Sequence, residues 1–157
     1  MAPSLLWIRE NEPSIWDRIC KVLLPKDYIR LKLTGIVASD VTDAGGTLLL
    51  NTAKRNWSKE IIEKLCIPYD FLPPLYESLR ITGQVTKKAT KEIFLKEGTP
   101  VFAGGADQVM MTVGSGVVEI GEIASSIGTG GLLIVCTDHP IIKSDKALHT
   151  IPHALSQ

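Results

Sequence analysis

The chain has 157 residues, of which 45% are hydrophobic and 22% are charged, a composition typical of a globular protein and unlike that of a disordered chain. Lysine plus arginine and aspartate plus glutamate each number 17, so the formal net charge is zero and no basic surplus indicates binding to nucleic acid or to an anionic membrane. This balance leaves a small molecule as the expected ligand.

The sequence also predicts a compartment. No apolar run approaches the roughly 20 residues that a membrane-spanning helix needs, and residues 1–4 lack the basic segment of a secretory signal. Cys20, Cys66 and Cys136 are widely separated and form no CxxC pair, which is typical of thiols in a reducing cytosol. We therefore expect a cytoplasmic protein whose cysteines are buried as small core residues.

Helices are predicted for the beginning of the chain. Apolar residues recur at helical spacing through residues 5–24, and a capping segment that ends at Pro13 divides this stretch into two helices. A third helix is predicted over residues 26–33, after Pro25, and Gly35 is expected to close it in the left-handed conformation.

Residues 39–47 are predicted to form a polar loop, because small residues and side chains that cap their own backbone dominate this stretch. Its carboxylates, Asp40 and Asp43, could form a pair for acid–base chemistry or for Mg²⁺. With hydroxyl groups and a glycine beside them, a solvated loop that caps itself is the favoured interpretation, and we expect no metal at these residues.

The middle of the chain is predicted to alternate between helices and short strands. Ser58 and Thr86 are good N-caps, so a helix is expected after each of them, the second over residues 87–96. Strands are predicted on both sides of this second helix, at residues 81–85 and 99–103, and the latter is expected to be buried. Helix, strand, glycine turn and helix in succession is the layout of an α/β layer.

A β-hairpin is predicted near the end of the chain. Two apolar strands, at residues 123–127 and 132–136, are joined by the glycine-rich residues 128–131, and the turn is expected to need positive φ angles. The change from helices to a hairpin predicts a domain boundary at residues 114–121, and one more strand is expected near His149.

Asp107 is the first candidate for chemistry, since it follows Gly104 and Gly105 at the start of a helix predicted over residues 108–113. It can simply cap this helix, where a carboxylate accepts backbone N–H groups and meets the positive end of the helix dipole. Alternatively, the glycines permit close approach of a ligand, and the carboxylate accepts the proton of a hydroxyl group. Both interpretations can hold together, because a carboxylate has two oxygens.

Thr129 is the second candidate, since it lies among three glycines of the predicted hairpin turn. The simpler interpretation is an ordinary hairpin turn. In the functional interpretation, successive glycine N–H groups form a concavity that binds an anion, and the threonine hydroxyl adds a donor to a phosphate oxygen. The lysine of a Walker loop is absent.

Histidine and tryptophan offer weaker candidates. His139, His149 and His153 do not lie at zinc-ligand spacing with any cysteine, so ordinary histidines are expected. The tryptophans are expected to pack in the protein rather than to form a stacking platform; they are Trp7, Trp16 and Trp57.

Six short motifs, taken together and in this order, resemble the FGGY carbohydrate kinases, and most closely the xylulose kinases within that family. The resemblance spans nearly the whole chain. The motifs are APSLLW at residues 2–7, VLLPKDYIRL at 22–31, LTG at 33–35, SDVTDAGGT at 39–47, GGADQ at 104–108 and SIGTG at 126–130.

The resemblance implies an α/β chain with the actin-like, ribonuclease-H-like sugar kinase fold, in which two domains close on a cleft that holds sugar on one side and ATP–Mg²⁺ on the other. It implies that residues 1–117 are the C-terminal part of the first, sugar-binding domain. Residues 118–157 would then be the beginning of the second, ATP-binding domain.

The resemblance also implies roles for the residues of both glycine turns. Asp107 would be the general base that takes the proton of the sugar hydroxyl as it attacks the γ-phosphate of ATP, and Gln108 would contact the sugar. A phosphate-binding turn would be formed by Gly128, Thr129, Gly130 and Gly131. The implied reaction is the ATP-dependent conversion of D-xylulose to D-xylulose 5-phosphate.

The chain departs from the family pattern in three respects. Ser4 stands where the family has lysine, and neither the N-terminal phosphate-contacting strand and loop nor the C-terminal adenine site has a counterpart here. Members of the family are also much longer. We therefore expect an internal fragment of a kinase that has little or no activity alone, with ATP and Mg²⁺ held mainly by other parts.

Other functions stay open at this point. Within the family, the substrate could be ribulose, gluconate or glycerol. Outside it, the chain could be a non-catalytic, kinase-derived interaction module. An incomplete domain leaves apolar faces uncovered, and two copies of the chain could cover these faces by forming a homodimer.

Overall fold

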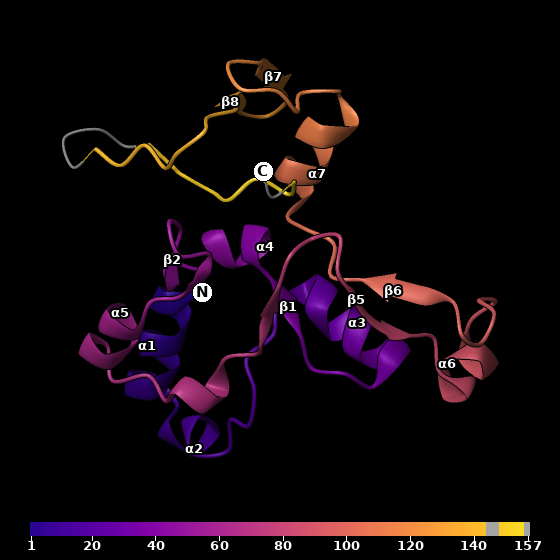
Figure 1. The fold of residues 1–157 in the computed structure, drawn as a ribbon. Coiled ribbons are helices and arrows are strands. Elements are labelled where there is room, and N and C mark those ends of the chain that lie inside the picture. The colour runs from indigo at the N-terminus through magenta and orange to yellow at the C-terminus, as the bar shows by residue number, and fades with distance from the viewer. Residues whose placement is uncertain (144–147, 156–157) are drawn as a thin grey trace.

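The computed structural model describes residues 1–143 and 148–155, in which helices alternate with short strands (Figure 1). Within these residues the strands form four two-stranded sheets, of which one is parallel and three are antiparallel. None of the helices in this described part is both long and apolar enough to cross a membrane. The alternation that the sequence predicts is confirmed.

Helices are present at the three places predicted before Gly35, but the second of them ends at Trp16 and does not continue to residue 24. α1 (Ala2–Asn11) and α2 (Pro13–Trp16) each have a proline at one of their first two positions, where its missing N–H has no partner in the helix to lose. α3 (Pro25–Thr34) also begins at a proline, and Gly35 closes it with a φ of 73°. The predicted left-handed cap is therefore confirmed.

The prediction of a solvated polar loop at residues 39–47 is wrong. This stretch contains β1 (Ser39–Asp40), which pairs in parallel with β4 (Leu75–Tyr76), and α4 (Val41–Gly45), which follows β1 directly. Asp40 has no exposed surface. The stretch is buried because its polar groups find partners inside the protein, which the local sequence does not reveal.

A small hairpin and two short helices connect α4 to β4. β2 (Leu50–Asn51) and β3 (Asn56–Trp57) are antiparallel. α5 (Lys59–Lys64) begins after Ser58, whose side chain caps it as predicted. The 3₁₀ helix η1 (Tyr69–Phe71) then leads to β4.

The next sheet pairs β5 (Ile81–Gln84) with β6 (Pro100–Phe102) in antiparallel register, and a register shift in β5 confirms the predicted strand or bulge. Between them, α6 (Lys87–Glu92) is capped by Thr86 as predicted but ends before residue 96. β6 is not the buried strand that the sequence predicts, since its first and last residues are exposed. Among the residues that the structure describes, this sheet consists of β5 and β6 alone, so β6 lies at its edge.

The last elements are α7 (Asp107–Gly114) and an antiparallel hairpin of β7 (Ile123–Ile127) and β8 (Gly131–Val135), which confirm the predicted helix and hairpin (Figure 1). The expected positive φ angles are not found, because the glycines of this hairpin turn are not among those with positive φ. The strand expected near His149 is also absent from residues 148–155.

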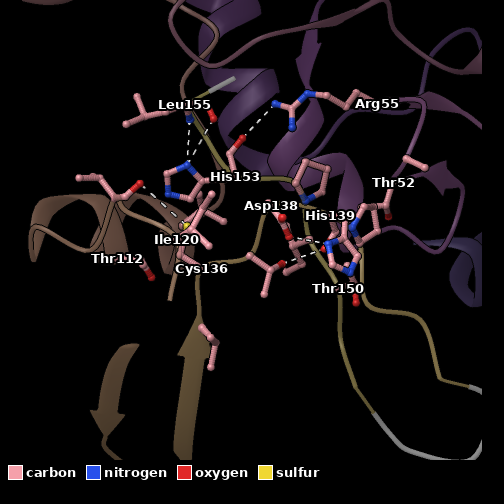
Figure 2. Close-up of a pocket in the computed structure, with 18 residues that line it drawn as sticks. Thr52, Arg55, Thr112, Ile120, Cys136, Asp138, His139, Thr150, His153 and Leu155 are labelled. Atoms are coloured by element: carbon pink, nitrogen blue, oxygen red, sulfur yellow. Dashed lines mark hydrogen bonds and ion pairs between the residues drawn. The ribbon is translucent and has the colours of Figure 1, made fainter. Parts of the chain in front are cut away.

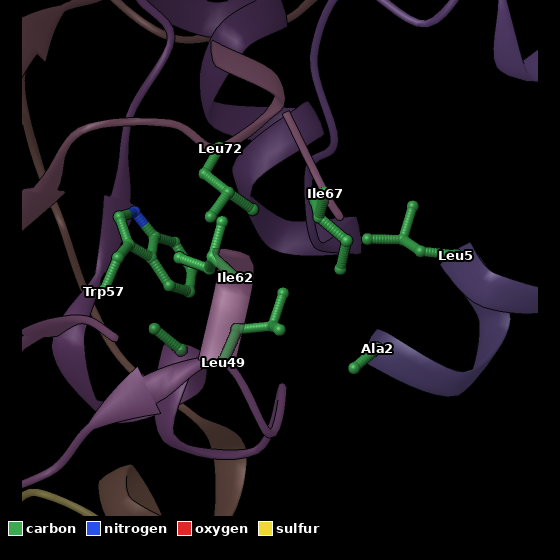
Figure 3. Close-up of a cluster of buried hydrophobic side chains, with 8 residues drawn as sticks. Ala2, Leu5, Leu49, Trp57, Ile62, Ile67 and Leu72 are labelled. Atoms are coloured by element: carbon green, nitrogen blue, oxygen red, sulfur yellow. The ribbon is translucent and has the colours of Figure 1, made fainter. Parts of the chain in front are cut away.

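The main core lies between the N-terminal helices and the β2–β3 hairpin (Figure 3). Trp57 is buried in it, and its indole Nε1–H donates to the carbonyl of Pro73 at 2.8 Å, so its one polar group is satisfied. The buried apolar residues of this core are Ala2, Leu5, Ala44, Leu49, Trp57, Ile62, Ile67 and Leu72.

The other tryptophans differ from one another. Trp16 is half-buried and packs edge-on against Phe71, with ring centroids 5.2 Å apart. Trp7 is 57% exposed, so the expected packing role is wrong for this residue. Trp7 lies on the outer side of α1, whose buried residues are Ala2 and Leu5.

The prediction of buried cysteines is also wrong. Cys20 and Cys66 are exposed and Cys136 is half-buried. Cys66 lies in the turn after α5 with a φ of 51°, and Cys20 lies in the segment between α2 and α3. Both are in connecting segments, which run over protein surfaces.

Two leucine-to-alanine variants, one at a buried position and one at an exposed position, test how much the main core stabilises the fold. Leu49 has no exposed surface, so Leu49→Ala removes buried methyl groups and leaves a cavity, and we expect the free energy of unfolding to fall by about 2–5 kcal/mol. Urea denaturation measures this change. The matched control is Leu79→Ala, at a leucine that is 67% exposed, where we expect a change within about 0.5 kcal/mol. Equal losses in both variants would contradict the described core.

Candidate active site

The turn between β6 and α7 requires glycine at two positions. Gly104 has a φ of +69°, which is the left-handed region. At Gly105, a Cβ atom would lie 2.6 Å from Met110 Cε and 2.7 Å from Thr42 Oγ1, so a side chain there would have to displace these groups. These glycines let the backbone turn sharply from the strand into the helix that begins at Asp107.

Distant parts of the chain hold the backbone of this turn. The N–H of Ala103 donates to the carbonyl of Arg80 at 2.8 Å, and the N–H of Gly104 donates to the carbonyl of Ser78 at 3.0 Å. The guanidinium of Arg30 donates to the carbonyl of Ala103. The turn therefore begins from a fixed position.

Asp107 and Gln108 follow the turn on the first turn of α7, and both side chains are exposed. The N-cap position belongs to Ala106, so Asp107 is not the N-cap residue. One oxygen of Asp107 accepts the N–H of Gln108 at 2.7 Å. Its carboxylate thus lies at the positive end of the helix dipole and faces solvent, which leaves it accessible to a ligand.

A buried network of charges lies behind the turn. Lys26 at the start of α3 contacts Asp27 at 2.6 Å, a carboxylate oxygen of Asp40, and Asp43 at 3.5 Å. Arg30 contacts Asp27 at 2.7 Å and also donates to a backbone carbonyl just before β1. Asp27 and Asp40 have no exposed surface and Arg30 has 4%, so the charges are compensated inside the protein.

The network shifts the pKa of two of its members. Burial by itself lowers the pKa of Lys26, but hydrogen bonds and attraction to Asp27 and Asp40 outweigh it, and the pKa is raised above its ordinary value. Burial raises the pKa of Asp43, and the attraction of Lys26 offsets this only in part. Lys26 is therefore held in its charged form more strongly than a free lysine.

Asp40 and Thr42 connect this network to the glycine turn. Asp40 Oδ1 accepts the N–H groups of Thr42 and Asp43 at 2.9 and 3.1 Å and so caps α4. The predicted capping of this segment by its own side chains is therefore confirmed. The same oxygen of Asp40 accepts the Thr42 hydroxyl at 2.6 Å. Thr42 Oγ1 in turn accepts the N–H of Ala106 at 2.8 Å.

The second predicted turn has a different environment. Gly128, Thr129, Gly130 and Gly131 are all exposed at the tip of the β7–β8 hairpin, where the N–H of Gly128 donates to the carbonyl of Gly130 at 2.9 Å. A Cβ at any of its glycines would meet no atom within 4 Å. No hydrogen bond or ion pair of the described residues joins this turn to Asp107 or Gln108.

The structure also contains a cavity of about 560 Å³ that sequence reasoning missed (Figure 2). It lies between the segment after β2, the side of α7, the segment after β8 and residues 150–155, and Arg55, His139 and His153 line it. Arg55 pairs with Glu77 and also donates to the carbonyl of His153 at 2.9 Å. Because these segments are distant in the sequence, no local motif could have revealed the cavity.

The cavity does not contain the predicted site residues. Asp107, Gln108 and the turn at residues 128–131 are not among its lining residues, although the helix that begins at Asp107 contributes Val109 and Thr112. The candidate site is therefore the exposed carboxylate and not this cavity.

The described geometry thus places an exposed carboxylate after a strand and a glycine turn, in a chain that also carries a glycine-rich hairpin tip. Comparison with known proteins identifies the family. Residues 1–114 match the FGGY family of carbohydrate kinases, N-terminal domain. The chain belongs to the FGGY family of carbohydrate kinases.

Three known proteins are similar over nearly the whole chain. The xylulose kinase of Escherichia coli (strain K12) is 41% identical over 156 residues, which are 99% of this chain and 32% of that protein. Crystal structures of a xyloylose kinase from Brucella ovis and of xylulose kinase from Rhodospirillum rubrum have TM-scores of 0.92 and 0.90 at 37% and 28% identity. Both matches cover 99% of this chain. They cover 32% of the solved chain from Brucella ovis and 31% of the one from Rhodospirillum rubrum.

These comparisons confirm the predicted family and the sugar kinase fold. The chain spans about a third of the length of these relatives. The division into domains at residues 117 and 118 and the roles of the individual site residues stay predictions.

Lys26 offers a test of the buried network. Lys26→Met keeps the aliphatic stem and removes the charge, so Asp27 and Asp40 stay buried without this cation, and we expect the free energy of unfolding to fall by about 3 kcal/mol at neutral pH. The pKa of Lys26 is raised above 10.5, so its stabilising contribution is complete below pH 10.5 and is lost as the pH rises through the raised pKa. The difference between wild type and variant should therefore narrow only above pH 10.5.

Urea denaturation over a pH series measures this difference, and Lys64→Met is the control. Lys64 forms an exposed pair with Glu60, so its loss should leave the unfolding midpoint nearly unchanged. A Lys26→Met protein as stable as the control at neutral pH would show that the network does not stabilise the fold.

Proposed function

We propose that the natural protein containing this chain uses ATP to phosphorylate a sugar hydroxyl, with D-xylulose as substrate and D-xylulose 5-phosphate as product. The observation that carries this proposal is the exposed Asp107 carboxylate after a glycine turn in a chain of the FGGY carbohydrate kinase family. The three similar proteins named above are kinases of xylulose or xyloylose, and these names favour a ketopentose over other sugars.

Asp107 is proposed as the general base of this reaction. The sugar oxygen forms a bond to the γ-phosphorus of ATP, the bond from this phosphorus to the β–γ bridging oxygen breaks, and ADP leaves. The proton of the sugar hydroxyl passes to a carboxylate oxygen of Asp107. Support comes from the exposure of this carboxylate, whose hydrogen bond to the neighbouring Gln108 N–H leaves lone pairs available.

Gln108 is proposed to contact the sugar. Its side chain is exposed directly beside Asp107, and an amide offers both donors and an acceptor for sugar hydroxyls. A contact of this kind orients the substrate, which is the main requirement of a phosphoryl transfer.

Gly128, Thr129, Gly130 and Gly131 are proposed to bind a phosphate of ATP. The open space around the glycines at the hairpin tip fits this role, since a phosphate can approach the backbone closely. The hydroxyl of Thr129 can then donate to a phosphate oxygen.

ATP is used by kinases together with Mg²⁺, and a bound Mg²⁺ neutralises charge on the phosphates. In residues 1–143 and 148–155, no group of three or more histidine, cysteine, aspartate or glutamate side chains is arranged to hold a metal ion. Asp40 and Asp43 do not fit this role, because Lys26 already occupies the space between them. No residue of this chain is therefore proposed to hold Mg²⁺.

A second candidate function is a non-catalytic interaction module, and the apolar surface of the β7–β8 hairpin favours it. Ile123, Ile127 and Leu133 are 58%, 89% and 69% exposed, and Ile123 and Val135 are paired across the strands. Turnover that depends on Asp107 decides between the two functions, since an interaction module does not need this carboxylate.

The Asp107→Ala variant tests the proposed base. Without a proton acceptor, we expect kcat for ATP-dependent phosphorylation to fall by about 10²–10⁴-fold while the protein stays folded. An ATP-coupled assay on a panel of ketoses, with the natural protein, measures kcat, and Asp17→Ala at another exposed aspartate is the control. An unimpaired Asp107→Ala enzyme would refute the assignment of the base.

The Thr129→Ala variant tests the phosphate-binding turn. Loss of a hydrogen bond to a charged phosphate should raise KM for ATP about tenfold and leave KM for the ketose unchanged. Steady-state kinetics with each substrate varied in turn measures both constants, and Thr99→Ala, at an exposed threonine outside the site, is the control. An unchanged KM for ATP would remove Thr129 from the nucleotide site.

A further inference from the structure

The hydroxyl of Thr42 lies between the buried carboxylate of Asp40 and the backbone N–H of Ala106, the N-cap residue of α7. It donates to Asp40 Oδ1 at 2.6 Å and accepts the N–H of Ala106 at 2.8 Å. Thr42 and Asp40 have no exposed surface, so water does not compete for these bonds. Thr42 is thus the side chain that connects the buried charges to the backbone next to Asp107.

The direction of these hydrogen bonds is fixed. Asp40 is paired with Lys26 and acts as an acceptor, so the hydrogen of the Thr42 hydroxyl must point toward it. A lone pair of Thr42 Oγ1 is left to face the N–H of Ala106. A hydroxyl can donate to Asp40 and accept the N–H of Ala106 at the same time, whereas an apolar side chain of the same shape can form neither hydrogen bond.

The backbone at Ala106 determines where Asp107 points. Ala106 is the N-cap residue of α7, with φ −57° and ψ 141°, and its carbonyl accepts the N–H of Met110 at 2.9 Å. Asp107 accepts the N–H of its neighbour Gln108, and the described residues show no hydrogen bond or ion pair from its carboxylate to another part of the chain. Its orientation therefore depends on the anchored backbone before it.

Thr42 also limits which residue can occupy the turn. A Cβ atom at Gly105 would lie 2.7 Å from Thr42 Oγ1, so the hydroxyl takes up space that a side chain at this position would need. The hydroxyl thus holds Ala106 by a hydrogen bond and favours glycine at position 105.

We propose that Thr42 is a positioning residue for Asp107: its hydroxyl, oriented by the Lys26–Asp40 pair, anchors the Ala106 amide and so aims the Asp107 carboxylate at the sugar hydroxyl. The proposal rests on the proposed function of Asp107 as base. Misplacement of a catalytic group by about 1 Å can reduce a rate about 100-fold, so loss of this anchor should appear in kcat.

Three variants separate positioning from general stability. Thr42→Val keeps the shape and removes the hydroxyl, and Thr42→Ser keeps the hydroxyl. The matched control is Thr47→Val, because Thr47 is equally buried and its hydroxyl donates to the Ala44 carbonyl at 2.6 Å and accepts the Leu49 N–H at 3.1 Å. Thr47→Val thus removes a buried hydroxyl that also donates one hydrogen bond and accepts another, but that does not bond to the turn before Asp107.

The first measurement is hydrogen exchange of the Ala106 amide by NMR on residues 1–157, and it does not require activity. We expect Thr42→Val to lower the protection of this amide roughly fivefold or more relative to Thr47→Val, and Thr42→Ser to retain it. Equal protection in Thr42→Val and Thr47→Val would overturn the proposal. If Thr42→Val does not fold, the comparison of Thr42→Ser with Thr42→Ala decides in the same way.

The second measurement is steady-state kinetics of the natural protein on D-xylulose and ATP. We expect Thr42→Val to lower kcat about 10- to 100-fold with both KM values nearly unchanged, Thr42→Ser to recover most of kcat, and Thr47→Val to keep it. A Thr42→Val enzyme with the kcat of Thr47→Val would overturn the proposal. If the wild-type protein phosphorylates no ketose, the proposed function fails, whereas the exchange of the Ala106 amide still decides whether Thr42 holds the turn.

Discussion

The ion pairs of Lys26 with Asp27 and Asp40 are the interaction on which the rest of the structure depends. Burying charged groups costs free energy unless each one finds an opposite charge and hydrogen bonds. Lys26, Arg30 and Asp27 all belong to α3, whereas Asp40 is the last residue of β1. This requirement fixes α3 against β1 and α4 in one arrangement.

The same network reaches the candidate site by two routes. Arg30 holds the carbonyl of Ala103 before the glycine turn, and Thr42 holds the N–H of Ala106 after it. The turn itself contains Gly104 and Gly105, which have no side chains that could fix it by packing. Its rigidity therefore comes from partners outside the turn, and the exposed carboxylate of Asp107 is presented from a backbone that the protein interior holds in place.

Local signals in the sequence predicted much of this arrangement. Gly35, Ser58 and Thr86 act within a few residues of themselves, so their roles as caps could be inferred from neighbouring positions. The burial of Asp40 could not, because its partner Lys26 is distant in the sequence and the polar composition around Asp40 is also that of a solvated loop. The cavity lined by Arg55 and His153 was missed for the same reason, since it joins segments nearly 100 residues apart.

The central claim is that the buried network presents Asp107 as the base of a sugar kinase. A crystal structure of the natural protein with D-xylulose and a non-hydrolysable ATP analogue tests it most directly. The account predicts that one carboxylate oxygen of Asp107 lies about 2.6–3.2 Å from the sugar hydroxyl that faces the γ-phosphate, with the Thr42 hydroxyl still bound to the Ala106 N–H. A ketose bound with another carboxylate at this hydroxyl, or with Asp107 directed away from it, would contradict the account.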